Sequence, residues 1–178
     1  GLSSPLVKQQ CYINGQWMDA KSGETIDVTN PATGDVLGTI PKMGAAETAE
    51  AIEGARIAQK AWAAMTAKER HGILIKWYNL MMENQGPLGE LLTLEQGKPL
   101  AEAKGEIAYG ASFIEWFAEE GKRTYGEIIP GHQRDKRIQV IRQPIGVTAA
   151  TTPWHFPNAM STRKAGPAPA AGWSMVVT

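Results

Sequence analysis

The residues from 145 to the end of the chain constrain the fold most strongly. Residues 145–151 are small and apolar without alternation, which is typical of a strand buried on both faces. Pro157 suits the first turn of a helix, which we expect to run to about Ala171. Residues 174–177 predict a second buried strand. A strand, a helix and a strand within about 32 residues form a βαβ unit, so the sequence predicts parallel strands and an α/β fold.

Short extended segments are expected elsewhere in the chain. Asn14 and Gly15 form a dipeptide that favours a tight hairpin. Residues 25–28 and 36–40 have strand character and flank a turn. Residues 137–142 alternate between apolar and polar side chains, which indicates a half-exposed strand.

Four helices are expected between these strands. Apolar residues at three- and four-residue spacing place the first over residues 47–65. The second starts at residue 66, the third runs from Pro87 to Gly97, and the fourth covers residues 99–121. Thr66 and Glu69 form a capping box for the second helix. Gly105 and Gly110 each weaken the fourth helix by up to ~1 kcal/mol.

Charge and hydropathy argue against several kinds of partner. The chain has 18 basic and 18 acidic residues and no basic stripe, so we expect no nucleic-acid partner. No apolar run approaches the roughly 20 residues that span a bilayer, so we expect no membrane contact. Cys11 is the single cysteine, which excludes an intrachain disulfide and favours a cytoplasmic location. We expect no metal site.

Five segments in order resemble the aldehyde dehydrogenase superfamily. They are residues 12–17, 30–34, 94–99, 144–147 and 152–157. Residues 113–123 and 162–167 resemble the succinate-semialdehyde branch in particular. Each segment alone is a weak signal, but all of them together, at the expected spacing, are specific. Gly97-Lys98-Pro99 is not a phosphate-binding loop, because proline stands where that loop needs Ser or Thr, so we interpret it as a helix terminator.

The resemblance implies the N-terminal part of the aldehyde dehydrogenase fold. It predicts three regions: residues 1–125 as strands and helices that pack on the cofactor domain, 126–144 as an antiparallel oligomerisation strand, and 145–178 as the first βαβ unit of the NAD(P)-binding domain. The parallel Rossmann-like sheet would be incomplete in this chain. A bare sheet edge and uncovered apolar helix faces favour a homo-oligomer or association with a subunit of the family.

The resemblance also implies an activity. Members of the family oxidise an aldehyde with NADP or NAD, using a cysteine thiolate as nucleophile and a glutamate to activate water. Both of these residues would lie beyond Thr178, and Cys11 has no basic neighbour that would favour its thiolate. We therefore expect a portion of a dehydrogenase that converts succinate semialdehyde to succinate and is inactive alone. The alternatives are a non-catalytic oligomerisation module and a remnant that only binds the cofactor. The sequence does not separate NAD from NADP, or succinate semialdehyde from its homologue one carbon longer.

The residues that resemble the family's site fall into three groups. By resemblance, the cofactor is bordered by Thr151, Thr152, Pro153, Trp154 and Thr178, the last of which replaces a lysine that contacts the ribose. His155 replaces an asparagine that helps to hold the oxyanion. Phe156 and Ala159 resemble pocket-lining residues, and Arg163 matches an arginine that binds the far carboxylate of the substrate.

Helix geometry adds an expectation about this segment. If the helix begins near His155, then His155, Ala159 and Arg163 follow one another at four-residue steps and line one face. Each has a plainer interpretation. Arg163 can face solvent, Trp154 can be ordinary packing, and His155 can form a local hydrogen bond. Pro169 falls inside the expected helix, at a cost of roughly 3 kcal/mol unless the helix ends or kinks there.

Overall fold

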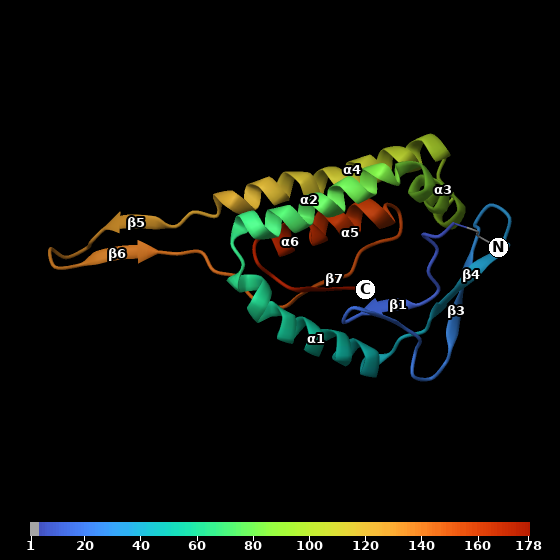
Figure 1. The fold of residues 1–178 in the computed structure, drawn as a ribbon, viewed down its shortest axis with the longest axis horizontal. Coiled ribbons are helices and arrows are strands. Elements are labelled where there is room, and N and C mark those ends of the chain that lie inside the picture. The colour runs from blue at the N-terminus through green and yellow to red at the C-terminus, as the bar shows by residue number, and fades with distance from the viewer. Residues whose placement is uncertain (1–3) are drawn as a thin grey trace.

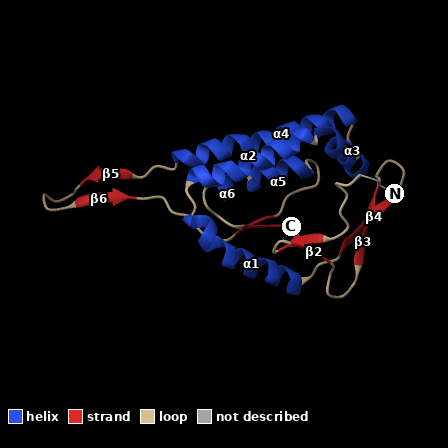
Figure 2. Ribbon diagram, in the orientation of Figure 1, coloured by secondary structure: helices blue, strands red, loops and turns tan. Residues whose placement is uncertain are grey.

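The computed structural model describes residues 4–178 as a rounded body with one long arm (Figure 1). The strands of the described part form four two-stranded sheets. Figure 2 shows the helices α2, α4, α5 and α6 together on one side of the strands β7 and β8, with helix α1 on the other. Among the described residues, none of the helices combines the length and the apolar character needed to cross a bilayer.

Two antiparallel hairpins form the N-terminal end of the body. Their strands are β1 (Cys11–Ile13), β2 (Gln16–Met18), β3 (Thr25–Thr29) and β4 (Val36–Pro41). Asn14 and Gly15 connect the first pair with φ angles of 53° and 78°. Two successive positive φ angles are what a tight hairpin turn requires, so the expectation from this dipeptide is confirmed. The strands expected around residues 25–40 are confirmed as well.

The four expected helices all form. They are α1 (Ala45–Ala64), α2 (Ala67–Glu83), α3 (Gln85–Gln96) and α4 (Leu100–Glu120), followed by one turn of 3-10 helix, η1 (Gly121–Arg123). Thr66 accepts a hydrogen bond from the Glu69 amide, and the Glu69 carboxylate accepts one from the Thr66 amide, which confirms the capping box. Gly97 ends α3 with a φ of 92°, a conformation that glycine adopts without strain.

Helix α4 is the centre of the body, because it packs against α2, α3, α5 and α6. Its inward stripe supplies most of the core, which also takes residues from α2, α3 and α6. The buried apolar cluster consists of Leu74, Met81, Leu92, Ala103, Ile107, Ala111, Ile114, Ala118 and Ala170. The small residues in this cluster let α4 and its neighbours approach closely.

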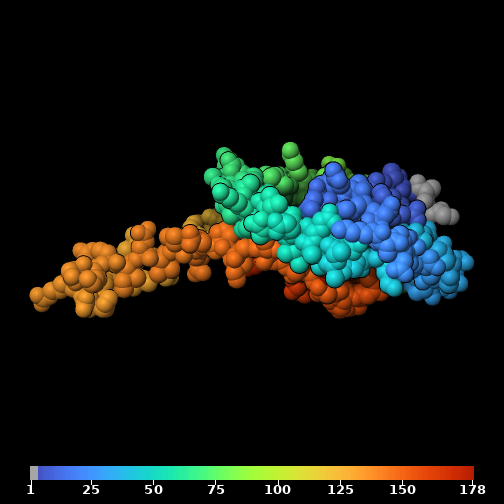
Figure 3. All heavy atoms as spheres, turned by 90° about the horizontal axis from the view of Figure 1, so that it is seen from below, coloured from blue at the N-terminus to red at the C-terminus, as the bar shows by residue number. Residues whose placement is uncertain are grey.

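The arm is a two-stranded antiparallel hairpin of β5 (Glu127–Pro130) and β6 (Arg137–Val140). Figure 3 shows it extending from the body as a narrow projection. The strand expected over residues 137–142 is therefore present but shorter, and its partner β5 was missed. Every residue of β5 is exposed, and Ile128 is 82% exposed, so the segment lacks the pattern of buried and exposed residues that identifies a strand.

The C-terminal residues form the expected βαβ unit. Strands β7 (Thr148–Ala150) and β8 (Met175–Val177) pair in parallel, with Ala149 opposite Val176. The prediction of a buried strand beginning at residue 145 was wrong in its extent, because Ile145 is 77% exposed and lies before β7.

The connecting helix is divided in two. It consists of α5 (Pro157–Ala165) and α6 (Pro167–Ala170), which meet at Gly166. The first amides of any helix have no partner within that helix. Because α6 starts again at Pro167, Pro169 occupies a position where a missing N–H removes no helical hydrogen bond. The break at Gly166 therefore resolves the conflict that Pro169 would create in one continuous helix.

Helix α1 holds the turn that leads from α6 into β8. The Gln59 side chain donates to the Gly172 carbonyl at 2.9 Å and accepts from the Ser174 amide at 2.6 Å. The Trp62 indole N–H donates to the Pro169 carbonyl at 2.8 Å. These contacts join residues more than a hundred positions apart and fix the start of β8.

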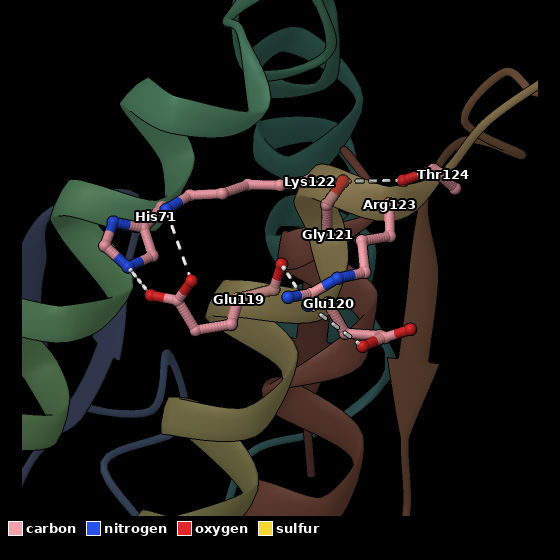
Figure 4. A network of polar contacts seen from close by, with 7 residues as sticks. All are labelled: His71, Glu119, Glu120, Gly121, Lys122, Arg123 and Thr124. Atoms are coloured by element: carbon pink, nitrogen blue, oxygen red, sulfur yellow. Dashed lines mark hydrogen bonds and ion pairs between the residues drawn. The ribbon is translucent and has the colours of Figure 1, made fainter.

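A polar cluster joins the end of α4 to α2 (Figure 4). His71 of α2 contacts the Glu119 carboxylate, which also accepts from Lys122 at 3.3 Å. Arg123 lies 3.4 Å from Glu120. The hydrogen bond from His71, followed by that from Lys122, lowers the pKa of Glu119 below its ordinary value of 4.5. The cluster therefore connects α2 to α4 through a carboxylate that is favoured in its charged form.

The two glycines of α4 provide a matched pair of substitutions. Gly110→Ala is expected to lower the free energy of unfolding by about 1–3 kcal/mol. Its added methyl group would lie 2.4 Å from Asn158 Oδ1 and 2.9 Å from Thr162 Oγ1 of α5. Gly105→Ala meets open space and is expected to raise the free energy of unfolding by about 0.5–1 kcal/mol. Urea unfolding followed by circular dichroism measures both. Two variants of equal stability would contradict the close packing of α4 on α5.

The polar cluster predicts a dependence of stability on pH. Because the pKa of Glu119 is lowered by folding, its contribution is present above the ordinary pKa of 4.5 and is lost as the pH falls through the lower, folded value. Glu119→Gln is therefore expected to be less stable than the parent above this range and equally stable below it. Unfolding curves at several pH values test this, with the exposed Glu90→Gln of α3 as control. A difference that persists in acid would exclude the proposed charge contact.

Candidate functional site

Two of the residues that resemble the family's site meet at the carboxyl ends of the parallel strands. Thr151 follows β7 and Thr178 follows β8, and their hydroxyl oxygens lie 2.8 Å apart. The Thr178 amide donates to the Ala150 carbonyl at 2.9 Å, which extends the pairing by one step. Both threonines are exposed. In open parallel sheets, ligands bind beyond the carboxyl ends of the strands, so these hydroxyls occupy the edge where a ligand is expected.

The segment that follows Thr151 carries three exposed aromatic side chains to the start of α5. Thr152 is tied to Ser161 of α5 by a 3.4 Å hydroxyl contact, and Pro153 follows it on the exposed loop. Trp154 is 58% exposed, and the rings of His155 and Phe156 pack edge to face at 5.5 Å. This loop therefore presents apolar and polar ring surface beside the two strand ends.

The expectation of one helical face through His155 was wrong. Helix α5 begins at Pro157, and Phe156 has a non-helical conformation, with φ of −136° and ψ of 69°. The ring of a proline disfavours the helical conformation in the residue before it, which explains why the helix cannot begin earlier. His155 consequently lies in the loop and does not share a helical face with Ala159 and Arg163.

Ala159 and Arg163 lie in different surroundings. Ala159 is fully buried, on the side of α5 that packs against α4. Arg163 has an exposed side chain whose guanidinium carbon lies 5.2 Å from the centre of the Phe113 ring on α4. The ring attracts the cation from its face, so the guanidinium is held at the surface with its donors available.

A buried carboxylate that sequence reasoning missed caps the start of α5. Glu106 of α4 is 3% exposed, and its Oε2 accepts from the amides of Asn158 at 2.9 Å and Ala159 at 3.3 Å. Its other oxygen contacts the ammonium group of Lys98, which lies 3.8 Å from the centre of the Phe156 ring. The sequence did contain a signal for this contact. Glu106 falls within the inward apolar stripe of α4, and a buried charge there needs a partner.

This carboxylate limits what the site can bind. A free helix N-terminus attracts anions through its unpaired amides. At α5 two of these amides already donate to Glu106, so a phosphate of a nicotinamide cofactor does not fit there. The exposed hydroxyls of Thr151 and Thr178 fit the neutral hydroxyls of a sugar instead. Among these residues, the carboxyl ends of the strands could therefore contact the ribose of a cofactor, but they do not form a cradle for its phosphates.

A groove of about 640 Å³ lies beside β8, between α1 and the first hairpin. Cys11, Met43, Ala51, Val176 and Thr178 are among the residues that line it. Burial raises the pKa of the Cys11 thiol, whereas a nucleophilic cysteine needs a lowered pKa. The position of Cys11 beside β8 therefore does not make it an activated nucleophile.

The sequence and the fold were compared with those of known proteins. Residues 17–178 match the Aldehyde dehydrogenase family. The chain is 70% identical over 174 residues to an NADP(+) succinate-semialdehyde dehydrogenase of Escherichia coli strain K12, covering 98% of this chain and 36% of the relative. It is 69% identical over 172 residues to a glutarate-semialdehyde dehydrogenase of Pseudomonas putida, covering 97% and 36%.

The fold agrees with solved structures of such proteins. A succinate-semialdehyde dehydrogenase from Burkholderia pseudomallei superposes with a TM-score of 0.97 at 58% identity, over 99% of this chain and 37% of that one. The chain thus spans about a third of the length of the relatives that it matches, and it corresponds to their N-terminal portion. Its α/β architecture is that of the N-terminal part of their fold. The chain belongs to the aldehyde dehydrogenase family.

Proposed function

We propose that this chain is the N-terminal portion of a semialdehyde dehydrogenase that uses NADP or NAD to oxidise succinate semialdehyde to succinate in the cytoplasm. The 70% identity to the E. coli succinate-semialdehyde dehydrogenase, over nearly all of this chain, carries the proposal. The name of that relative specifies NADP(+), which makes NADP the first cofactor to test. A relative that is 69% identical is named for glutarate semialdehyde, so a substrate one carbon longer is the second candidate.

Each part of the site has a proposed role. The carboxyl ends of the strands and the following loop border the cofactor, through Thr151, Thr152, Pro153, Trp154 and Thr178. His155 stands where a donor to the oxyanion is needed, and Phe156 forms part of the substrate pocket. Arg163 binds the carboxylate at the far end of the substrate, because its planar guanidinium can donate two parallel hydrogen bonds. Ala159 supports the loop by packing under α4.

The bound cofactor would accept hydride from the aldehyde carbon, and the residues of this chain would orient and bind. The reaction also needs a thiolate nucleophile and a base, and Cys11 has the raised pKa of an inactive thiol. We therefore expect the 178-residue chain to be catalytically silent by itself.

The arm favours a second role in assembly. Ile128, Ile129 and Val140 of its strands, and Ile141 directly after β6, are exposed on a projection away from the body (Figure 1). Exposed apolar side chains on an open strand pair are typical of a surface that another chain covers. We propose that the arm joins this chain to a second copy of itself or to another subunit of the family. This role requires no catalytic residue, so it is also compatible with the alternative hypothesis that the chain is a non-catalytic oligomerisation module.

A chimera tests the proposed activity and the role of Arg163. Residues 1–178 replace the matching portion of the E. coli relative, and the product is expected to oxidise succinate semialdehyde with NADP. Arg163→Leu should raise KM for succinate semialdehyde about 10- to 100-fold, because a charged hydrogen-bonded contact is lost. The KM for butanal, which has no carboxylate, should hardly change. Lys164→Leu, at the neighbouring exposed position, is the control. Equal effects on both aldehydes would exclude carboxylate recognition by Arg163.

His155 predicts a gain of activity in the same chimera. His155→Asn is expected to raise kcat by about 100-fold or more, because the amide restores a donor to the oxyanion in the transition state. KM should change little, since the oxyanion exists only after the substrate has bound. Steady-state kinetics measures both constants. An unchanged kcat would show that position 155 does not contribute to the oxyanion site.

A further inference from the structure

Lys98 and Glu106 form a buried ion pair beneath the candidate site. The side chain of Glu106 is fully buried and that of Lys98 is only 9% exposed. Burying two opposite charges carries a desolvation cost that an exposed surface pair avoids. The contact therefore calls for an explanation beyond general stability, and the elements that it joins provide one.

The pair connects three parts of the chain that are separate in sequence. Lys98 lies in the connection between α3 and α4, Glu106 lies on α4, and the amides of Asn158 and Ala159 belong to α5. One carboxylate oxygen serves Lys98 and the other serves the two amides. The carboxylate thus acts as the cap of α5, because the residue at the cap position, Phe156, makes no side-chain hydrogen bond to the helix.

Lys98 contacts the same point of the chain from a second direction. Its ammonium nitrogen lies 3.8 Å from the centre of the Phe156 ring, within the range of a cation–π contact. The Phe156 ring in turn packs edge to face with His155. The pair therefore holds the main chain after Phe156 through Glu106 and the aromatic side chain of Phe156 through Lys98.

We propose that Lys98 and Glu106 are positioning residues that fix the loop Trp154–Phe156 at the start of α5. This inference rests on the proposed function for its consequence, since that function makes the loop part of the substrate and cofactor site. Neither residue touches the reacting atoms. Their effect on the reaction passes through the main chain of α5 and the ring of Phe156.

The first experiment uses the chain itself and needs no activity. Amide exchange of the 15N-labelled protein is followed by NMR for the parent, Glu106→Gln and Glu120→Gln. Glu106→Gln should exchange the Asn158 and Ala159 amides about 10-fold faster, because hydrogen bonds to a charged acceptor are stronger than those to a neutral one. Glu120→Gln, in an exposed ion pair of the same helix, should leave both amides unchanged. Unchanged protection in Glu106→Gln would overturn the proposal.

A second variant covers the case in which Glu106→Gln fails to fold because Lys98 is left unpaired. Glu106→Gln/Lys98→Met removes both charges and keeps an oxygen that can accept from α5. It should fold and still show faster exchange at Asn158 and Ala159 than the parent. Parent-like exchange in this double variant would also overturn the proposal.

The functional experiment uses the chimera. Lys98→Met should lower kcat by up to about 100-fold, the scale of a misplaced reacting geometry. It should also lower the midpoint of thermal unfolding relative to the surface control Lys122→Met, because it leaves the buried Glu106 unpaired, so kcat is compared well below both midpoints. Lys98→Arg keeps the cation and should recover most of kcat. A loss of kcat that arginine does not recover, or no loss at all, would contradict a positioning role. If the parent chimera is inactive, the proposed function fails and amide exchange alone decides the positioning.

Discussion

Parallel strands cannot be joined by a tight turn, and most of this structure follows from that constraint. The connection between β7 and β8 has to leave the sheet, run back along it and enter again at the same end. Helices α5 and α6 make this crossover and need a partner for their outer side, which α4 provides. Close approach is possible because Gly110 has no side chain where α4 meets α5 and because Ala159 is small. The carboxyl ends of both strands then lie beside the start of α5, where the candidate site forms.

The start of α5 is also where this chain differs from a simple nucleotide-binding crossover. In such folds the helix N-terminus after the first strand is free to receive phosphate. Here Glu106 occupies it from α4, so the first crossover contributes an edge of hydroxyl groups and an aromatic loop, without a phosphate cradle. Under the proposed function, this portion of the fold would position the neutral sugar of the cofactor and the aldehyde, and the positive charge for the cofactor phosphates would come from other residues.

Local signals in the sequence predicted much of the fold. The hairpin at Asn14 and Gly15, the cap at Thr66 and the parallel βαβ unit each depend on residues close in sequence or on a rule of connection, and all three are present. Strand β5 was not predicted, because all of its residues are exposed and it therefore lacks the alternation of buried apolar and exposed polar residues that identifies a strand. Pro169 indicated a conflict with one continuous helix, but the position of the break at Gly166 was not predicted, because it depends on how α6 restarts. For the site, the resemblance named Thr151 and Thr178 separately as residues near the cofactor, and the structure brings their hydroxyl groups together. The contact of Glu106 with α5 was not predicted, because it links positions 52 residues apart and depends on how two helices pack.

The central claim is that residues 148–177 form a parallel strand–helix–strand unit whose carboxyl edge carries the site. Through-hydrogen-bond NMR couplings in the isolated chain test it most directly. The structure predicts couplings from the Thr148 amide to the Ser174 carbonyl and from the Thr178 amide to the Ala150 carbonyl, each a 2.9 Å contact. Absence of both couplings, or close contacts between opposing α-protons that mark antiparallel pairing, would contradict the account.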